Sequence, residues 1–324
     1  MITIVYDDGP IAIENPLASA FFYNSSGSCV PIQRNGYLTP TTEEERITLN
    51  TVRKQLINTQ FSKTYEEFSS HPVVSKETRR DPTAVFIGTP LETPHNTCHD
   101  VIGGTDGNMS DISISAFDPL FWLHHCNMDR FYYNWMYKMT DGFKKPLHMI
   151  EDSTRESGHA PFFPTKESLY ATNPHTYNYG WMNNTGMYQI LGTTLHLEKF
   201  PYTYEEIVLP TTVPLPVSSY INILNIPIPM KTIRIKAYLV RKGTVLNHET
   251  DFAGVVVWLG LNRAERHCSR CDVTRTDLQI DITEACARRG IHAGNASEYE
   301  TILEAFGLTH EQILQDGILT VKIQ

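Results

Sequence analysis

The sequence lacks a long hydrophobic run, an excess of positive charge and a dense set of cysteines, and each absence excludes a class of protein. The longest apolar run, residues 253–261, is about half of the roughly 18 residues that a membrane-spanning helix needs. With 27 Lys and Arg against 36 Asp and Glu, the net charge of −9 offers no broad positive surface for nucleic acid or anionic lipid. Six cysteines in 324 residues are too few for a disulfide scaffold.

The N-terminus also lacks the marks of a secretion signal. Residues 1–8 carry neither a basic stretch nor a long apolar core, so we expect a cytoplasmic protein that engages neither nucleic acid nor membrane. A content of 41% hydrophobic and 10% aromatic residues is sufficient for a packed core. The oligomeric state is left open by these numbers.

The pattern of apolar and turn-forming residues predicts a mainly helical domain followed by a small β-rich, sandwich-like domain. The boundaries are expected at 1–205 for the helical part, 206–230 for a proline-rich linker and 231–324 for the β-rich part. We expect helices from about Thr41, at 92–102 and at 117–139, strands at 232–240, 254–259, 278–282 and 319–323, and helical insertions at 299–306 and 310–314. The helix at 117–139 is aromatic on almost every face, which predicts that it is buried.

Two groups of histidines lie on these expected helices. His95 and His99 are four residues apart, which places both imidazoles on one helix face within reach of one metal ion. Such a pair alone is also common without metal. His124 and His125, however, lie within an aromatic helix, where unoccupied ring nitrogens are costly. A third ligand from a second helix is how helical bundles build metal sites.

The residues alone do not choose between the two candidates for that third ligand. Neighbours on a helix point about 100° apart, so only His124 or His125 faces a given ion. Three neutral imidazoles suit copper or zinc, and spacing does not discriminate between the two metals.

Residues 118–129, Asp-Pro-Leu-Phe-Trp-Leu-His-His-Cys-Asn-Met-Asp, resemble the second copper signature of the tyrosinase family, the type-3 copper polyphenol oxidases related to molluscan haemocyanin. The resemblance covers about residues 10–205 and is strong at 92–135. It implies copper as cofactor, held by His95, His99 and His125, because the family's ligand precedes the final Asp by four residues. It also implies phenolic substrates and O2, which in the family lead from monophenols to diphenols, quinones and melanin.

One part of the family pattern is missing. The family holds two copper ions with three histidines each, and no histidine occurs here before His71. The chain therefore resembles the second-copper half of a tyrosinase, and we expect it to be inactive or incomplete by itself.

Glu92 and Asn96 match family positions that are thought to hold a water that deprotonates the incoming phenol. A carboxylate aided by an amide can orient a water as a general base. The alternative is that Glu92 stabilises a helix N-terminus and that Asn96 is merely polar. Monophenol hydroxylation is therefore only slightly favoured over diphenol oxidation alone.

The β-rich part resembles the C-terminal tail of long fungal tyrosinases, which carries a CxxC motif and shields the active site. The resemblance implies that Cys268 and Cys271 load copper and that Trp258 or Leu259 covers the site. Thiolates suit Cu(I), but a reduced surface pair explains the two cysteines equally well.

Two other functions use the same ligands. A haemocyanin-like protein would bind O2 without turnover, and a mononuclear zinc hydrolase would hold Zn²⁺ with an open fourth position. A single unit with a CxxC tail favours the tyrosinase-like enzyme.

Overall fold

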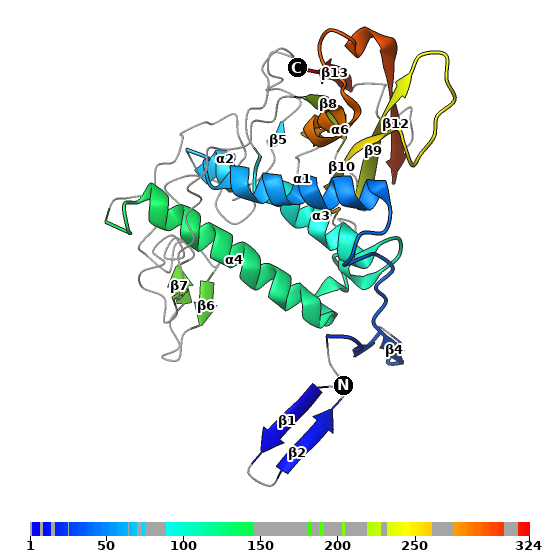
Figure 1. The fold of residues 1–324 in the computed structure, drawn as a ribbon. Helices are drawn as coiled ribbons and strands as arrows, with labels where there is room; N and C mark the ends of the chain where they lie inside the picture. Colours follow the sequence, from blue (N-terminus) through cyan, green and yellow to red (C-terminus); the bar gives the residue numbers. More distant parts are fainter. Residues whose placement is uncertain are drawn as a thin grey trace.

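The computed structural model describes residues 2–6, 9–13, 17–24, 26–63, 65–69, 73–74, 89–144, 180–182, 188–190, 203–204, 219–227, 232–260, 275–307 and 317–324. Three longer helices form its centre: α1 (Glu43–Thr59), α3 (Glu92–Gly103) and α4 (Pro119–Met139). Figure 1 shows α1 and α4 on either side of α3, with the β-rich part beyond α1. Among the described helices, none is both long and apolar enough to cross a membrane.

The start of α1 follows from its local sequence. Thr42 accepts a hydrogen bond from the Glu45 amide, and the Glu45 carboxylate accepts one from the Thr42 amide, which together form a capping box. Three glutamates in the first turn add favourable charge at the positive end of the helix dipole. This agrees with the helix start expected near Thr41.

Short elements connect and flank the helices. They comprise strands β1 (Ile2–Tyr6), β2 (Gly9–Ile13), β3 (Phe21–Tyr23), β4 (Cys29–Pro31), β5 (Val73–Val74), β6 (Gly180–Met182) and β7 (Tyr188–Ile190), helix α2 (Tyr65–Ser69), and 3-10 turns η1 (Asn108–Ser110) and η2 (Ser115–Phe117). The pairs β1–β2, β3–β4 and β6–β7 are antiparallel.

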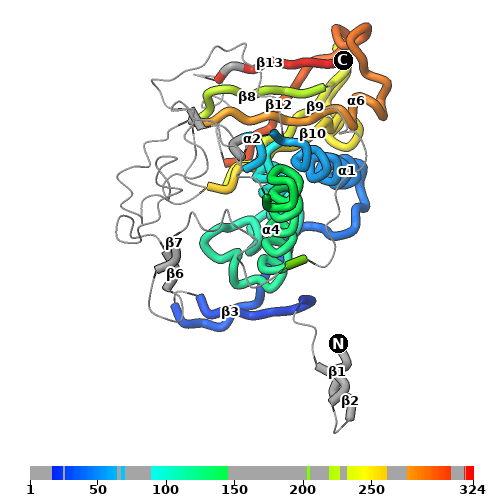
Figure 2. The backbone as a smooth tube through the Cα atoms, turned by 90° about the vertical axis from the view of Figure 1, so that its left-hand side faces the viewer, coloured from blue at the N-terminus to red at the C-terminus, as the bar shows by residue number. Residues whose placement is uncertain are grey.

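The C-terminal part is built on two antiparallel sheets. Its elements are β8 (Tyr220–Pro227), β9 (Ile233–Arg241), β10 (Phe252–Trp258), β11 (Arg275–Asp281), α6 (Thr283–Arg289), η6 (Ala296–Glu298), β12 (Tyr299–Phe306) and β13 (Ile318–Lys322). One sheet has the order β10-β9-β12 and the other β13-β8-β11-β5, and Figure 2 shows β8, β9, β12 and β13 gathered at one end of the molecule. The predicted order, a helical part followed by a small β-rich part, is confirmed.

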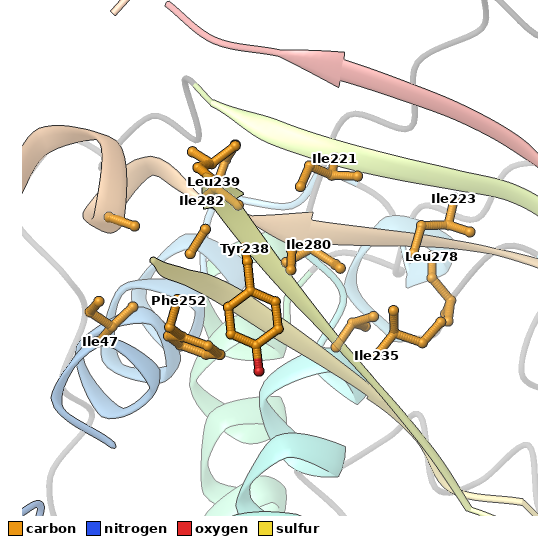
Figure 3. Close-up of a cluster of buried hydrophobic side chains, with 14 of the residues drawn as sticks. Ile47, Ile221, Ile223, Ile235, Tyr238, Leu239, Phe252, Leu278, Ile280 and Ile282 are labelled. Atoms are coloured by element: carbon orange, nitrogen blue, oxygen red, sulfur yellow. The ribbon is translucent and has the colours of Figure 1, made fainter. Parts of the chain in front are cut away.

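A single buried apolar cluster joins both sheets to α1. Ile221 of β8, Ile235 of β9, Phe252 of β10 and Ile280 of β11 are fully buried in it, and Ile47 of α1 lies in the same cluster (Figure 3). At about 25 cal/mol per Å² of apolar surface removed from water, such a cluster is a main source of stability. The β-rich part and α1 therefore share one hydrophobic core.

Three expectations about elements are wrong. Residues 299–306 form the strand β12 instead of a helix, and residues 220–227 of the expected linker form the strand β8, which ends at Pro227. Helix α4 is not buried on every face, because Trp122 and Leu123 are 60% and 54% exposed. Residues 310–314 lie outside the described part of the chain.

Candidate metal centre

Helix α3 carries the first pair of histidines on one face. His95 and His99 lie one turn apart with ring centroids separated by 4.7 Å. The helix ends where Gly104 takes a φ of 64°, a conformation that glycine adopts without steric cost. The predicted bounds of this helix are confirmed to within one residue.

The start of helix α4 is fixed by a buried ion pair. The Asp118 carboxylate caps the helix by accepting from the Leu120 amide at 2.8 Å, and Pro119 occupies the first helical position. Arg34 donates to both oxygens of Asp118, at 2.8 and 2.7 Å. Because Asp118 is fully buried, this two-pronged contact sets where α4 begins and hence where its histidines lie.

The rings of all four histidines converge between α3 and α4. His95 lies 5.0 Å from both His124 and His125, measured between ring centroids. His99 lies 4.8 Å from His124 and 5.4 Å from His125. The two helices predicted to share an ion therefore do bring their histidines together.

Hydrogen bonds to Nδ1 leave the Nε2 atoms of the α3 pair available as ligands. His95 Nδ1 pairs with Asn96 Oδ1 at 2.8 Å, and His99 Nδ1 pairs with the Met109 carbonyl of η1 at 2.7 Å. Both oxygens are acceptors, so Nδ1 carries the proton in each ring and the Nε2 lone pair is free. Metal-binding histidines are held in this way in general.

Distances between Nε2 atoms fit a shared metal ion. His125 Nε2 lies 3.4 Å from that of His95 and 3.2 Å from that of His99. Two nitrogens bound at about 2.0–2.1 Å in tetrahedral directions lie about 3.3 Å apart. His124 could serve instead, because ring nitrogens of His95, His99 and His124 lie within 4.8 Å of one another. Its Nε2 is buried and has no hydrogen-bond partner among the described residues. The donor set fits copper with either neighbour as third ligand.

Burial keeps these rings in the neutral form that binds metal. Desolvation, together with the nearby His95, lowers the pKa of His99 to about 3 and that of His125 to about 4. Desolvation also lowers the pKa of His124 and of His95, although in His95 the bond to Asn96 and the charge of Glu92 oppose the effect. Metal binding near neutral pH therefore requires little proton release.

The two residues expected to hold a water lie next to the histidines. Glu92 is the first residue of α3 and partly buried, and its charge opposes the lowering of the His95 pKa by burial. Asn96 is buried, and its Nδ2 donates to the Val257 carbonyl of β10 at 3.4 Å. Their role in phenol activation stays a prediction.

The other expected site residues lie at the end of β10 or outside the described residues. Trp258, at the end of β10, packs against the apolar cluster of the β-rich part, and Leu259 follows it, half-buried. Cys268 and Cys271 fall outside the described residues. Roles in covering the site or loading copper stay predictions for all four.

Three contacts around the site were not predicted from the sequence. They are the Met109 carbonyl on His99, the Arg34 clamp on Asp118, and a 2.6 Å hydrogen bond from the Tyr204 hydroxyl to Asp129 on α4. The Asp118-Pro119 pair is a helix-start signal that would have placed the cap, whereas no local signal identifies a distant arginine or a backbone carbonyl.

Residues 12–138 match the family model for the common central domain of tyrosinase. The tyrosinase of Aspergillus oryzae is 26% identical over 285 residues, which cover 78% of this chain and 50% of that protein. Among solved structures, mushroom tyrosinase matches with a TM-score of 0.57 at 17% identity over 99% of this chain and 67% of that one. A functional unit of octopus haemocyanin matches with a TM-score of 0.50 at 14% identity, covering 91% and 68%. The chain thus spans about half the length of the Aspergillus oryzae relative.

Proposed function

We propose, because this chain belongs to the tyrosinase family, that α3 and α4 hold one copper ion of a phenol-oxidising centre. The observation that carries the proposal is that His125 Nε2 lies at metal-ligand spacing from the Nε2 atoms of both His95 and His99. When bound, copper in this family supplies the redox chemistry that uses O2 on phenols. By resemblance to fungal tyrosinases, the products belong to the route to melanin.

Distances between Nε2 atoms, together with the family motif, favour His125 over His124 as the third ligand. His125 Nε2 lies 3.4 Å from the His95 Nε2 and 3.2 Å from the His99 Nε2, which is the spacing of nitrogens bound to one ion. The resemblance points the same way, because the ligand of the family motif precedes the final Asp, here Asp129, by four residues.

Glu92 and Asn96 supply the polar groups for an incoming phenol. A carboxylate at the start of α3 and a neighbouring amide can orient one water, which takes the phenolic proton as a general base. Asn96 Oδ1 already accepts from His95, so the carboxylate of Glu92 is the proton acceptor of the pair. This supports monophenol hydroxylation in the complete enzyme.

Among the described residues, the one group of side chains that could hold a metal ion is His95, His99 and His124, which shares its α3 pair with the proposed site. We therefore propose that residues 1–324 alone bind about one copper ion per chain at the three-histidine site and do not oxidise catechol. In the family a second copper site is needed for that reaction, and its histidines are missing upstream of His71.

Metal counting by mass spectrometry, combined with a catechol assay, tests this proposal. Purified chain loaded with Cu(I) or Cu(II) is compared with His99→Ala, which removes a ligand, and with His248→Ala, which removes an exposed histidine of the β-rich part. We expect about one histidine-bound copper, its loss only in His99→Ala, and no quinone. Zinc in preference to copper would support the hydrolase, and robust quinone formation would contradict the single-copper proposal.

A further inference from the structure

We infer that a cavity between α1 and α4 binds a small aromatic carboxylate that carries a hydroxyl group. The cavity has a volume of about 200 Å³ and lies between the C-terminal end of α1 and the middle of α4. Since an apolar cavity of about 150 Å³ holds one benzene molecule, this volume admits one aromatic ring with small substituents. The histidines lie between α3 and α4 instead, so the inference does not rest on the proposed copper site.

Apolar side chains of both helices form most of the cavity wall. Leu56 and Ile57 come from the last turn of α1, and Phe131 comes from the middle of α4. A water molecule in a cavity needs two to four polar partners, and a wall of this kind offers few. The wall therefore favours a ligand with an apolar body, such as an aromatic ring.

Arg130 gives the cavity a positive charge. Its side chain is half-buried in the wall and forms no ion pair with another described residue. Among the described residues that line the cavity, none is acidic. Lys138 adds a second positive charge at the end of α1, because its Nζ donates to the Gln60 carbonyl at 3.0 Å. A guanidinium binds a carboxylate through two parallel hydrogen bonds, so Arg130 favours an anionic end on the ligand.

Two buried amide side chains in the wall have oxygens without a partner. Gln60 and Asn134 are 2% and 4% exposed, and Gln60 Oε1 and Asn134 Oδ1 accept no hydrogen bond from the described residues. The Gln60 amide has one orientation, because its Nε2 donates to the Phe131 carbonyl at 3.1 Å and a flipped amide would oppose two oxygens. Buried acceptors are normally satisfied, so a ligand hydroxyl supplies the missing donor once an amide turns toward it.

These three features together specify one class of ligand. The ring lies between the apolar walls, the carboxylate contacts Arg130, and the hydroxyl donates to the amide oxygens. 4-Hydroxybenzoate has all three groups on a single ring. The cavity is open on one side, where Asn127 is exposed, so the ligand can enter from solvent.

A calorimetric titration with three probes tests the site. The full chain is freed of metal by dialysis against EDTA and titrated with 4-hydroxybenzoate, with benzoate, which lacks the hydroxyl, and with phenol, which lacks the carboxylate. We expect 4-hydroxybenzoate to bind with a Kd of about 1 mM or tighter and the other two to bind about tenfold more weakly. Equal affinity for the three probes, or no binding of 4-hydroxybenzoate up to about 10 mM, would overturn the inference.

Substitutions in the wall test each contact separately. Arg130→Met should weaken 4-hydroxybenzoate binding about tenfold and change phenol binding less than about twofold, whereas Arg46→Met, which removes an exposed arginine of α1, should change neither. Asn134→Leu should reduce the preference for 4-hydroxybenzoate over benzoate to about threefold. Ile57→Phe fills the cavity and should abolish binding. An Arg130→Met variant with wild-type affinity for 4-hydroxybenzoate contradicts the inference whether or not Ile57→Phe folds.

The outcomes separate this site from the proposed function. The titrations use metal-free protein, so a chain that binds no copper contradicts the metal centre and leaves the expected titrations unchanged. A chain that binds copper but not 4-hydroxybenzoate overturns the cavity site alone. Binding that persists undiminished in both Arg130→Met and Ile57→Phe would place the ligand elsewhere, at the histidines for example, and would also overturn it.

Discussion

Replacing Asp118 with alanine tests whether the buried ion pair at the start of α4 holds the histidine-bearing helix in place. The carboxylate is fully buried and accepts three hydrogen bonds, two from Arg34 and one from the Leu120 amide. Alanine removes all three and leaves a guanidinium that is only 17% exposed without its partner. The substitution therefore removes the helix cap and the ion pair at the same time.

The expected loss of stability follows from those contacts. Removing one member of a buried ion pair costs about 3–5 kcal/mol, and losing a helix cap costs about 1 kcal/mol. Both losses come from one carboxylate and overlap, so we expect Asp118→Ala to lower the free energy of unfolding by about 4 kcal/mol. Asp118→Asn keeps an acceptor for the cap and loses only the charge, which should cost about 2–3 kcal/mol.

Urea unfolding, followed by circular dichroism and tryptophan fluorescence in parallel, measures these differences. Arg46→Ala is the control, because it removes an exposed pair with Glu43 and should cost less than about 1 kcal/mol. If Asp118→Ala falls within about 1 kcal/mol of this control at an equal urea slope, the pair does not anchor α4.

Three further predictions concern packing and charge. The Lys54 hydrogen bond lowers the pKa of Glu284. The pair therefore stabilises the fold above the unfolded-state pKa of the carboxyl, and this stabilisation is lost as the pH falls. In urea titrations, the difference in unfolding free energy between wild type and Glu284→Gln should close between about pH 5 and 3. Phe68→Ala should cost about 3–5 kcal/mol in the same assay and alter the near-ultraviolet dichroism of Trp135, whose ring lies 4.3 Å away. Gly254→Ala would place a Cβ 2.7 Å from a β11 carbonyl and should lower the thermal midpoint, at a cost of about 1–3 kcal/mol, whereas an unchanged midpoint would contradict this close approach.

Elements with a local signal could be predicted from the sequence. The capping box of Thr42 and Glu45 marks the start of α1, and the glycine at 104 marks the end of α3. Helix α4 begins two residues later than expected, because residues 115–117 form a 3-10 turn and Pro119 favours the first helical position. Residues at or next to each boundary therefore determine where these three helix ends lie.

Strand β12 shows where local reasoning failed. Tyr299, Ile302, Leu303 and Phe306 recur at helical spacing, yet the segment pairs along its whole length with β9. The edge of β9 offers a full ladder of backbone hydrogen bonds, and its apolar face continues the core of the sheet. A partner that is about 60 residues away in the chain decided the structure, which no window of local sequence contains.

The histidine site, too, has a part that could be predicted from the sequence and a part that could not. Helical spacing and the motif are sufficient to predict that His95 and His99 meet the pair at 124 and 125. The groups that orient these rings have no such signal, since the Met109 carbonyl has no side-chain signature. The choice within the pair at 124 and 125 depends on the distances between ring nitrogens, which follow from how α3 and α4 pack.

Helix α3 explains why the centre needs support from several directions. It has only 12 residues, its N-cap has no side-chain hydrogen bond, and its last turn carries no basic residue. Isolated helices shorter than about 12–15 residues are marginal in water, so α3 is helical because α1, α4 and β10 pack against it. Two proposed ligands thus lie on a helix that depends on its neighbours, and metal binding must be coupled to the folding of the β-rich part. Copper should accordingly raise the unfolding midpoint of the sheets as well as that of the helices.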